Sequence, residues 1–154
     1  MLVVRKSVAA DADALGLVMY DAIRSGPSRY TEAQRIAWLD RPPAGGNWAV
    51  RLSTQQVWMA EAQGEPLGFL TLDETGYIDL AFVTAAAQGK GVFSALYDAL
   101  EAAAMEDGLT RLWTHASLMA QPVFEARGFR VIRHETIDRK GETLARAEME
   151  KSLT

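Results

Sequence analysis

The sequence predicts a mixed α/β (α+β) fold with a mostly antiparallel central sheet of about six or seven strands and about four flanking helices. Three observations predict it. Short apolar runs bounded by turn residues recur between residues 57 and 83. From Gly91 to Asp107 the apolar period becomes helical, and another strand follows at residues 111–116. Two strands joined by a helix in this way should lie parallel, with a right-handed crossover.

The N-terminal third predicts one strand and two helices. Leu2–Ser7 is a short apolar strand, after which Asp11 or Asp13 offers an N-cap. The first helix is indicated by apolar residues at helical spacing, namely Leu15, Val18, Met19 and Ile23. The second begins at Thr31, where a hydroxyl followed by Gln three residues later forms the capping-box pattern. Residues 41–46, rich in proline and glycine, predict a loop.

The remaining elements follow the same reasoning. Strands are expected at 57–62, 67–72 and 77–83, and the long helix should end at Gly108. A short helix is expected at 122–127. The chain then closes with a hairpin of strands at 129–137 and 143–149.

Composition excludes several classes of protein. A chain of 154 residues is the size of one domain, so we expect a single domain over residues 1–154. The net charge of -4 argues against a nucleic-acid partner. With no cysteine and two histidines, we expect no metal site. The sequence has neither a signal peptide nor the roughly 20 apolar residues of a membrane helix, so a cytoplasmic location without membrane contact is expected.

The most informative segment joins the strand ending at Val83 to the long helix. It reads Gln88, Gly89, Lys90, Gly91, Val92, Phe93, Ser94. A helix N-terminus presents unpaired N–H groups and partial positive charge, and glycine lets the backbone approach an anion closely. These amides could bind a pyrophosphate. An ordinary turn would look the same if this segment stood alone.

Two nucleotide-binding motifs can be tested against this segment, and neither fits. A Walker loop needs glycine, four residues and then Gly-Lys-Ser/Thr, which is absent. A dinucleotide fingerprint needs a third glycine where Ser94 stands and an acidic residue about 20 positions later. Both are missing, which disfavours a nicotinamide enzyme.

The segment from Ile78 to Phe93 resembles motif A of the GNAT superfamily of N-acetyltransferases, Gln/Arg-x-x-Gly-x-Gly/Ala. A second stretch is similar to motif B of the family, which ends in Gly-Phe. It is carried by Ala116, Ser117, Ala120, Pro122, Phe124, Glu125, Gly128 and Phe129. Two motifs at the separation found in the family are far more specific than a glycine pair, and the resemblance covers most of the chain.

The resemblance implies a GNAT-like fold whose sheet is splayed between the parallel strands ending at Val83 and Ala116. Acetyl-CoA would be the co-substrate, with its pantetheine arm paired to the backbone of Phe82 and Val83. Its pyrophosphate would lie on residues 88–94, with the Ser94 hydroxyl and Lys90 as further contacts. An N–H near Val83 would polarise the acetyl carbonyl. Ser117 stands where relatives often carry an Asn that contacts the arm, although it could equally cap a helix.

The sequence departs from the family pattern at two positions. Phe93 replaces a small residue, so its side chain should point into the core. Phe124 stands where many relatives carry the tyrosine that protonates the leaving thiolate. Because a thiolate leaves readily near neutral pH, catalysis can survive this change, but no residue is assigned as the acid.

Asp79 and His115 are the candidates for removing the amine proton. Strand alternation would place Asp79 on the face of Ala81 and Val83, at the reacting end. An arginine partner would instead give it a structural role. His115 ends the strand at the gap and has the pKa class of a proton relay, although a surface histidine at a strand end is common.

Tyr30, Trp38 and Glu61 are the candidates for binding the acceptor. They lie in the part of the chain where the family builds its acceptor pocket, and Trp38 could also be core. The expected reaction is direct transfer of acetyl to a primary amine of a small molecule or peptide. The alternative is a non-catalytic acyl-CoA-binding sensor, which Phe124 favours. The exposed edges of the C-terminal hairpin would permit a homodimer.

Overall fold

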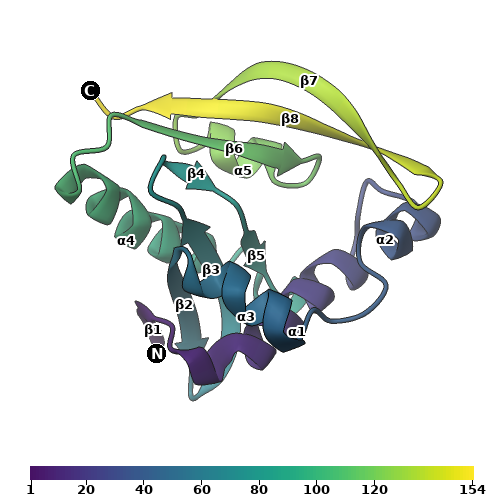
Figure 1. Ribbon diagram of the computed structural model, residues 1–154, viewed down its shortest axis with the longest axis horizontal. Coiled ribbons are helices and arrows are strands. Elements are labelled where there is room, and N and C mark those ends of the chain that lie inside the picture. Colours follow the sequence, from purple (N-terminus) through teal and green to yellow (C-terminus); the bar gives the residue numbers. More distant parts are fainter.

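The computed structural model describes residues 1–154 (Figure 1). The N-terminal half contains β1 (Leu2–Lys6), α1 (Ala12–Arg24), α2 (Glu32–Trp38), α3 (Gly45–Ser53), β2 (Gln56–Ala62) and β3 (Glu65–Leu72). The C-terminal half contains β4 (Tyr77–Ile78), β5 (Ala81–Val83), α4 (Val92–Glu106), β6 (Arg111–Ser117), α5 (Gln121–Glu125), β7 (Arg130–Arg139) and β8 (Glu142–Ser152). Short 3₁₀ turns precede α1 (η1, Ala9–Asp11) and α4 (η2, Ala85–Ala87). No helix has both the length and the apolar character needed to cross a bilayer.

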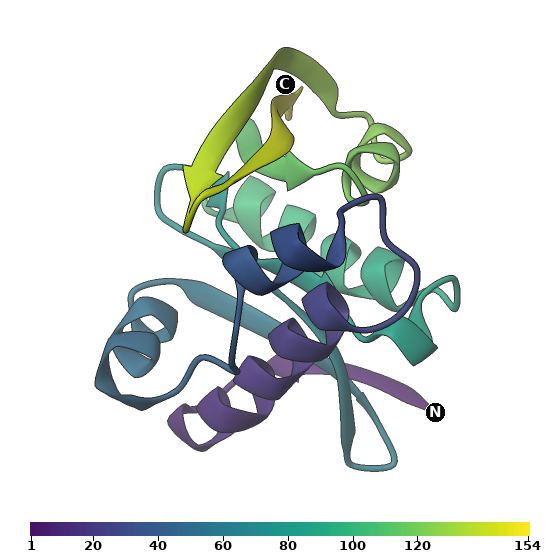
Figure 2. The same cartoon turned by 90° about the vertical axis from the view of Figure 1, so that its right-hand side faces the viewer.

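The strands form two four-stranded sheets, in the orders β1-β2-β3-β5 and β4-β6-β8-β7. All neighbours are antiparallel except β4 and β6, which are parallel with Tyr77 opposite Trp113 and Ile78 opposite Thr114. Helix α4 makes the crossover between the strands at 77–83 and 111–117, as predicted. Figure 2 shows α2 lying between α1 and the β7–β8 hairpin.

The strand predicted at 77–83 is divided in two, and this division opens the sheet. Its first part, β4, pairs with β6, whereas β5 pairs with β3 in the other sheet. The chain changes sheets at Asp79 and Leu80. There, Leu80 is anchored to the buried Thr71 of β3, whose hydroxyl accepts its N–H at 2.9 Å. The parallel pair therefore ends after two residues, and β5 and β6 diverge.

Two apolar clusters fill the interior on opposite sides of the first sheet. Neighbouring residues of β3 enter different clusters, with Phe69 packing beside α1 and Leu70 beside α4. The period-2 alternation of a strand explains this division. The predicted helix faces are buried: Leu15, Val18, Met19 and Ile23 in α1, and Leu96, Leu100 and Ala104 in α4.

Local signals at the helix ends were mostly correct. Thr31 accepts the N–H of Gln34 at 3.1 Å, and the Gln34 side chain accepts the N–H of Thr31 at 2.8 Å, completing the capping box. Asp11 precedes α1 but does not cap it. Its carboxylate accepts the N–H of Val8 at 2.7 Å and binds Arg5.

Helix α3 was not predicted, because its first residues, Gly45 and Gly46, have loop composition. The helix is held by tertiary contacts. The Trp48 indole donates to the carbonyl of Ala12 at 2.7 Å, and Trp48 and Leu52 are buried against α1.

Candidate active site

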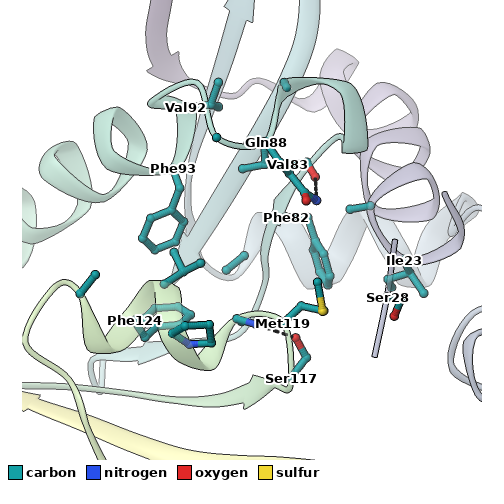
Figure 3. Close-up of a pocket in the computed structure, with 18 of the residues that line it drawn as sticks. Ile23, Ser28, Phe82, Val83, Gln88, Val92, Phe93, Ser117, Met119 and Phe124 are labelled. Atoms are coloured by element: carbon teal, nitrogen blue, oxygen red, sulfur yellow. Dashed lines mark hydrogen bonds between the residues drawn. The ribbon is translucent and has the colours of Figure 1, made fainter. Parts of the chain in front are cut away.

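A cavity of about 600 Å³ occupies the gap between β5 and β6. Its walls are the C-terminal end of α1, α2, β5, the turn before α4, and the segment from Ser117 to α5. Fifteen of its 24 lining residues are hydrophobic. In Figure 3, Phe93 and Phe124 form one end, Ile23 and Ser28 the other, and Phe82 projects between them toward Met119. The cavity is long and mainly apolar, as a pantetheine arm and an acyl group require.

The β5 side of this gap presents backbone groups that have no partner strand, although the Val83 carbonyl accepts the Gln88 side chain. Leu80 and Thr84 exchange backbone hydrogen bonds with β3. Because the direction of these bonds alternates along a strand, Phe82 is also directed at β3, whereas Ala81 and Val83 direct their groups into the gap. The expectation for the Val83 backbone fits this geometry. The expectation for the Phe82 backbone was wrong, because β3 already pairs with it, and Phe82 lines the cavity with its ring instead.

The β6 side of the gap is similar. The N–H of Trp113 donates to the carbonyl of Gly76 at 3.0 Å, on the side facing β4. By the same alternation, the backbone groups of Ser117 face that side too, beyond the end of β4. An extended amide-bearing arm could therefore bind between β5 and β6 as an inserted strand.

The turn before α4 has the features of an anion site. Gly89 and Gly91 have φ values of +77° and +83°, and a side chain at either would meet no atom within 4 Å. None of the N–H groups from Gly89 to Ser94 donates a hydrogen bond to the protein, since the first helical bond runs from Ala95 to Gly91. These donors lie beside the cavity wall formed by Gln88, Gly89, Gly91, Val92, Phe93 and Ser94. A pyrophosphate here would meet unpaired N–H groups and the positive end of the α4 dipole.

The other expected cofactor residues lie at or near this wall. The Gln88 side chain donates to the carbonyl of Val83 at 3.2 Å, which links the turn to β5. Lys90 is exposed and lies outside the cavity lining, so it could reach phosphate only from the solvent side. Ser117 lines the cavity, and its hydroxyl accepts the N–H of Ala120 at 3.2 Å. Its local capping role is thus compatible with a contact to the arm.

The two phenylalanines that depart from the family pattern pack on each other. Phe93 meets Phe124 edge-to-face, with ring centroids 5.3 Å apart, and stacks on Tyr97 at 5.9 Å. Phe93 points into the apolar cluster, as predicted, and its ring edge also lines the cavity. Phe124 is buried and has no polar atom on its side chain, so it cannot protonate a thiolate.

Asp79 does not lie in the cavity wall. The strand is interrupted between β4 and β5. The strand alternation expected to bring Asp79 beside Val83 therefore does not hold. Arg51 of α3 binds its carboxylate with two hydrogen bonds, at 2.8 and 2.9 Å, and Gln55 donates a third at 2.9 Å. Burial opposes ionisation of Asp79, but the Arg51 and Gln55 contacts outweigh it and lower the pKa. The expected geometry of Asp79 as the general base was therefore wrong.

His115 lies on the face of β6 opposite the α4 cluster. The Tyr77 hydroxyl lies 2.8 Å from its Nδ1, and Glu148 Oε1 lies 3.8 Å from its Nε2. Burial, aided by the charge of Arg146, lowers the pKa of His115 below its ordinary value. The lowered pKa favours the neutral imidazole, which is the form that can accept a proton. His115 and Tyr77 both lie outside the cavity lining, so the link to a bound amine would run through water.

His115 also belongs to the one cluster with the residue types of a metal site. Ligand atoms of His115, Glu135 and Glu148 lie within 4.8 Å of one another. Both carboxylates are already ion-paired: Arg146 binds Glu135 at 2.7 Å, and Arg133 binds Glu148 at 2.8 Å. A cation would have to displace these arginines.

The three expected acceptor residues separate into two groups. Tyr30 and Trp38 line the cavity and meet edge-to-face, with centroids 5.8 Å apart. The Tyr30 hydroxyl accepts the N–H of Leu118 and donates to the carbonyl of Ala145, at 2.9 and 2.6 Å. Glu61 lies elsewhere, on β2, where it binds Arg5 at 3.2 Å. The expectation that Glu61 serves the acceptor pocket was wrong, because Glu61 lies near the end of β2, between β1 and β3, and outside the cavity lining.

Several lining residues could not be identified from the motifs. Arg127, the only charged residue of the lining, follows α5 and carries no motif signal beyond its place before Gly128. Ile23 had the spacing of a core residue. Asp21 supports the site from behind: its carboxylate accepts the N–H of Ala85 at 2.8 Å, where η2 leads into the anion-binding turn. Only the folded chain brings Asp21 and Ala85 together, so sequence spacing gives no sign of it.

Replacing Asp21 with alanine should weaken CoA binding about three- to tenfold, the effect of one hydrogen bond that positions the turn. The loss would leave the Ala85 N–H without its partner and release η2. Asp21→Asn is the matched control, because its amide oxygen can still accept that hydrogen bond. Isothermal titration of the three proteins with CoA measures the effect. Equal affinities would mean that Asp21 does not position the turn.

Comparisons with known proteins agree with this geometry. The family model for the acetyltransferase (GNAT) domain matches residues 43–153. The uncharacterized N-acetyltransferase YafP of Escherichia coli (strain K12) is 30% identical over 139 residues, covering 90% of this chain and 87% of that protein. A GCN5-related N-acetyltransferase structure from Rhodopseudomonas palustris superposes with a TM-score of 0.89 at 32% identity, covering 98% of this chain and 95% of that one.

A more distant structure shares the fold. The phosphinothricin acetyltransferase of Sinorhizobium meliloti, solved with acetyl-CoA, has a TM-score of 0.76 at 20% identity, with 99% of this chain and 88% of that one covered. The family match spans most of the chain, and the sequence relative and the fold agree with it. The chain belongs to the GNAT superfamily of N-acetyltransferases.

Proposed function

We propose that this protein transfers the acetyl group of acetyl-CoA to a primary amine by direct attack within a ternary complex. The observation that carries the proposal is the run of unpaired N–H groups from Gly89 to Ser94, at the edge of an apolar cavity between diverging strands. A diphosphate joined to a long amide-bearing arm fits both features. Family membership supports the same donor.

In the proposed reaction the amine nitrogen bonds to the acetyl carbon, and the bond from that carbon to sulfur breaks. The gap-facing N–H of Val83 stabilises the negative charge that develops on the carbonyl oxygen. The amine proton leaves toward His115, and the sulfur departs as a thiolate that water protonates. Because Phe124 offers no proton, this mechanism assigns no side chain as the acid.

The donor is tested by thermal unfolding and by release of free CoA thiol. Acetyl-CoA and CoA at a hundredfold excess over their dissociation constants should each stabilise the protein by about 2.7 kcal/mol, and NAD should not. Thiol release should depend on the added amine. An alternative function, acyl-CoA binding without catalysis, is favoured by the buried Phe124. CoA binding with no thiol release under any amine would support that alternative and reject the enzyme.

Replacing His115 with glutamine should lower kcat about 100-fold at pH 8, the usual contribution of a general base. In the wild type, kcat at saturating amine should fall in acid, at a pH below the ordinary range of a histidine, because burial lowers the pKa of His115 and its protonation stops it acting as a base. The variant should lack this fall. His134→Gln, at the exposed second histidine, is the control. If both variants kept the wild-type profile, His115 would not be the base.

A further inference from the structure

We propose that the acceptor amine carries an apolar body, aliphatic or aromatic, which binds in the part of the cavity beside α2. This inference rests on the proposed function and names the class of acceptor. The subsite is defined here by Ile23, Tyr30, Trp38, Phe82 and Met119, all of which line the cavity.

The subsite lies on the side of the sheet opposite the α4 cluster. On β5, Ala81 and Val83 pack with the cluster beside α4, whereas Phe82 packs with the cluster beside α1. The anion-binding turn is on the α4 side. A donor held there leaves the space around Phe82 free, and an acceptor approaching the acetyl group from the other side enters it. Figure 3 shows Phe82 between Met119 and Ile23 in this region.

The walls of this subsite are apolar and largely aromatic. Trp38 bridges two other rings, with its centroid 5.8 Å from that of Tyr30 and 6.1 Å from that of Phe82. Both hydrogen-bonding directions of the Tyr30 hydroxyl are taken by the main chain. Tyr30 therefore presents its ring to an acceptor and has no free polar group to offer. Met119, a flexible apolar side chain, is 40% exposed at the cavity edge.

The charged groups around the cavity argue against three other classes of acceptor, namely polyamines, aminosugars and amino acids. None of the 24 residues that line the cavity is acidic. Asp79 and Glu61 are bound by Arg51 and Arg5 and lie outside the lining, and the Asp21 carboxylate behind the turn accepts the N–H of Ala85. A polyamine or an aminosugar would lose hydration at each ammonium group without gaining a carboxylate partner. An amino acid would need a cation for its carboxylate, and Arg127 lies on the α5 side, paired with Asp98.

The test is kcat/KM for n-alkylamines from propylamine to hexylamine, which share nearly the same nitrogen basicity and differ only in apolar length. In each case the nitrogen gains the acetyl carbon, CoA gains the released proton, and nothing else changes. Each methylene that enters the subsite should raise kcat/KM about fourfold. Spermidine and glutamate should be poor acceptors. A flat series, or a preference for spermidine or glutamate, would overturn the proposal while leaving the acetyltransferase function intact.

Substitutions in the subsite test where the alkyl chain of the acceptor binds. Trp38→Ala should lower kcat/KM for hexylamine about tenfold or more, and should lower it less for propylamine, whose shorter chain fills less of the subsite. Met119→Ala, at an exposed side chain that folding does not require, should reduce the slope of the series in the same direction. Ile36→Ala, on the exposed face of α2, is the matched control. An unchanged slope in Met119→Ala and in a folded Trp38→Ala would place the apolar body elsewhere. If no amine released CoA from a protein that binds acetyl-CoA, the proposed function itself would fail.

Discussion

A protein carrying Gly91→Glu is expected to lose its stabilisation by CoA. Gly91 precedes the first residue of α4 with φ +83°, and its neighbours, Val92 to Ser94, hold unpaired N–H groups. A glutamate here places a carboxylate where the pyrophosphate would bind, so the two anions repel each other and compete for the same donors. We expect at least a hundredfold loss of affinity, equivalent to about 2.7 kcal/mol.

The fold should survive this substitution. Apart from its chain neighbours, no atom lies within 4 Å of a Cβ added at Gly91, so the side chain starts in open space. The cost to folding is that of a left-handed backbone, about 1–2 kcal/mol, partly offset by a negative charge at a helix N-terminus. Thermal unfolding without ligand measures this cost, and unfolding with CoA measures the lost affinity.

Gly91→Ala is the matched control, because it carries the same backbone cost without the charge. It should keep most of the CoA response, and the difference between the two variants isolates the repulsion. If Gly91→Glu responded to CoA as well as Gly91→Ala does, the anion site would not be at this turn. The acetyl-CoA assignment would then lose its main support.

Features set by neighbouring residues could be predicted from the sequence. The capping box at Thr31, the helical spacing in α1 and α4, and the stop at Gly108 each depend on contacts within a few residues. The anion-binding turn belongs to this class too, because its glycines and the helix that follows are contiguous. The sequence therefore predicted the glycine turn and the helix start that the structure shows, and their role in binding the cofactor stays a prediction.

Features set by distant residues could not be predicted. Asp79 was assigned a reacting position by strand alternation, but Leu80 is drawn to Thr71 and breaks the strand. The side chain that binds Asp79 is Arg51, on α3. This helix was not predicted, because the glycine pair at its start has loop composition. The cavity wall likewise joins Tyr30, on the loop before α2, to Leu118, which follows β6. No periodicity within one segment carries such information.

Replacing Gly76 with alanine is expected to destabilise the protein by about 3–5 kcal/mol, through a close backbone contact that fixes the parallel pair. Gly76 has φ +91°, and an added Cβ would lie 2.3 Å from the carbonyl oxygen of Arg111. That oxygen is main chain and cannot turn aside as a flexible side chain could. The Gly76 carbonyl also accepts the N–H of Trp113 at 3.0 Å, so a shift that relieves the contact disturbs the β4–β6 pairing.

Gly64→Ala is the control that separates the cost of a left-handed backbone from the cost of the close contact at Gly76. Gly64 has φ +79° in the β2–β3 turn, but no atom lies within 4 Å of an added Cβ. It should therefore show only the backbone cost, about 1–2 kcal/mol in urea unfolding. The excess for Gly76→Ala measures how tightly β4 is held against β6 before the strands diverge. Equal losses of unfolding free energy in the two variants would mean that Gly76 lies farther from the Arg111 carbonyl than described. The β4–β6 register, and with it the gap proposed for the pantetheine arm, would then have to be different.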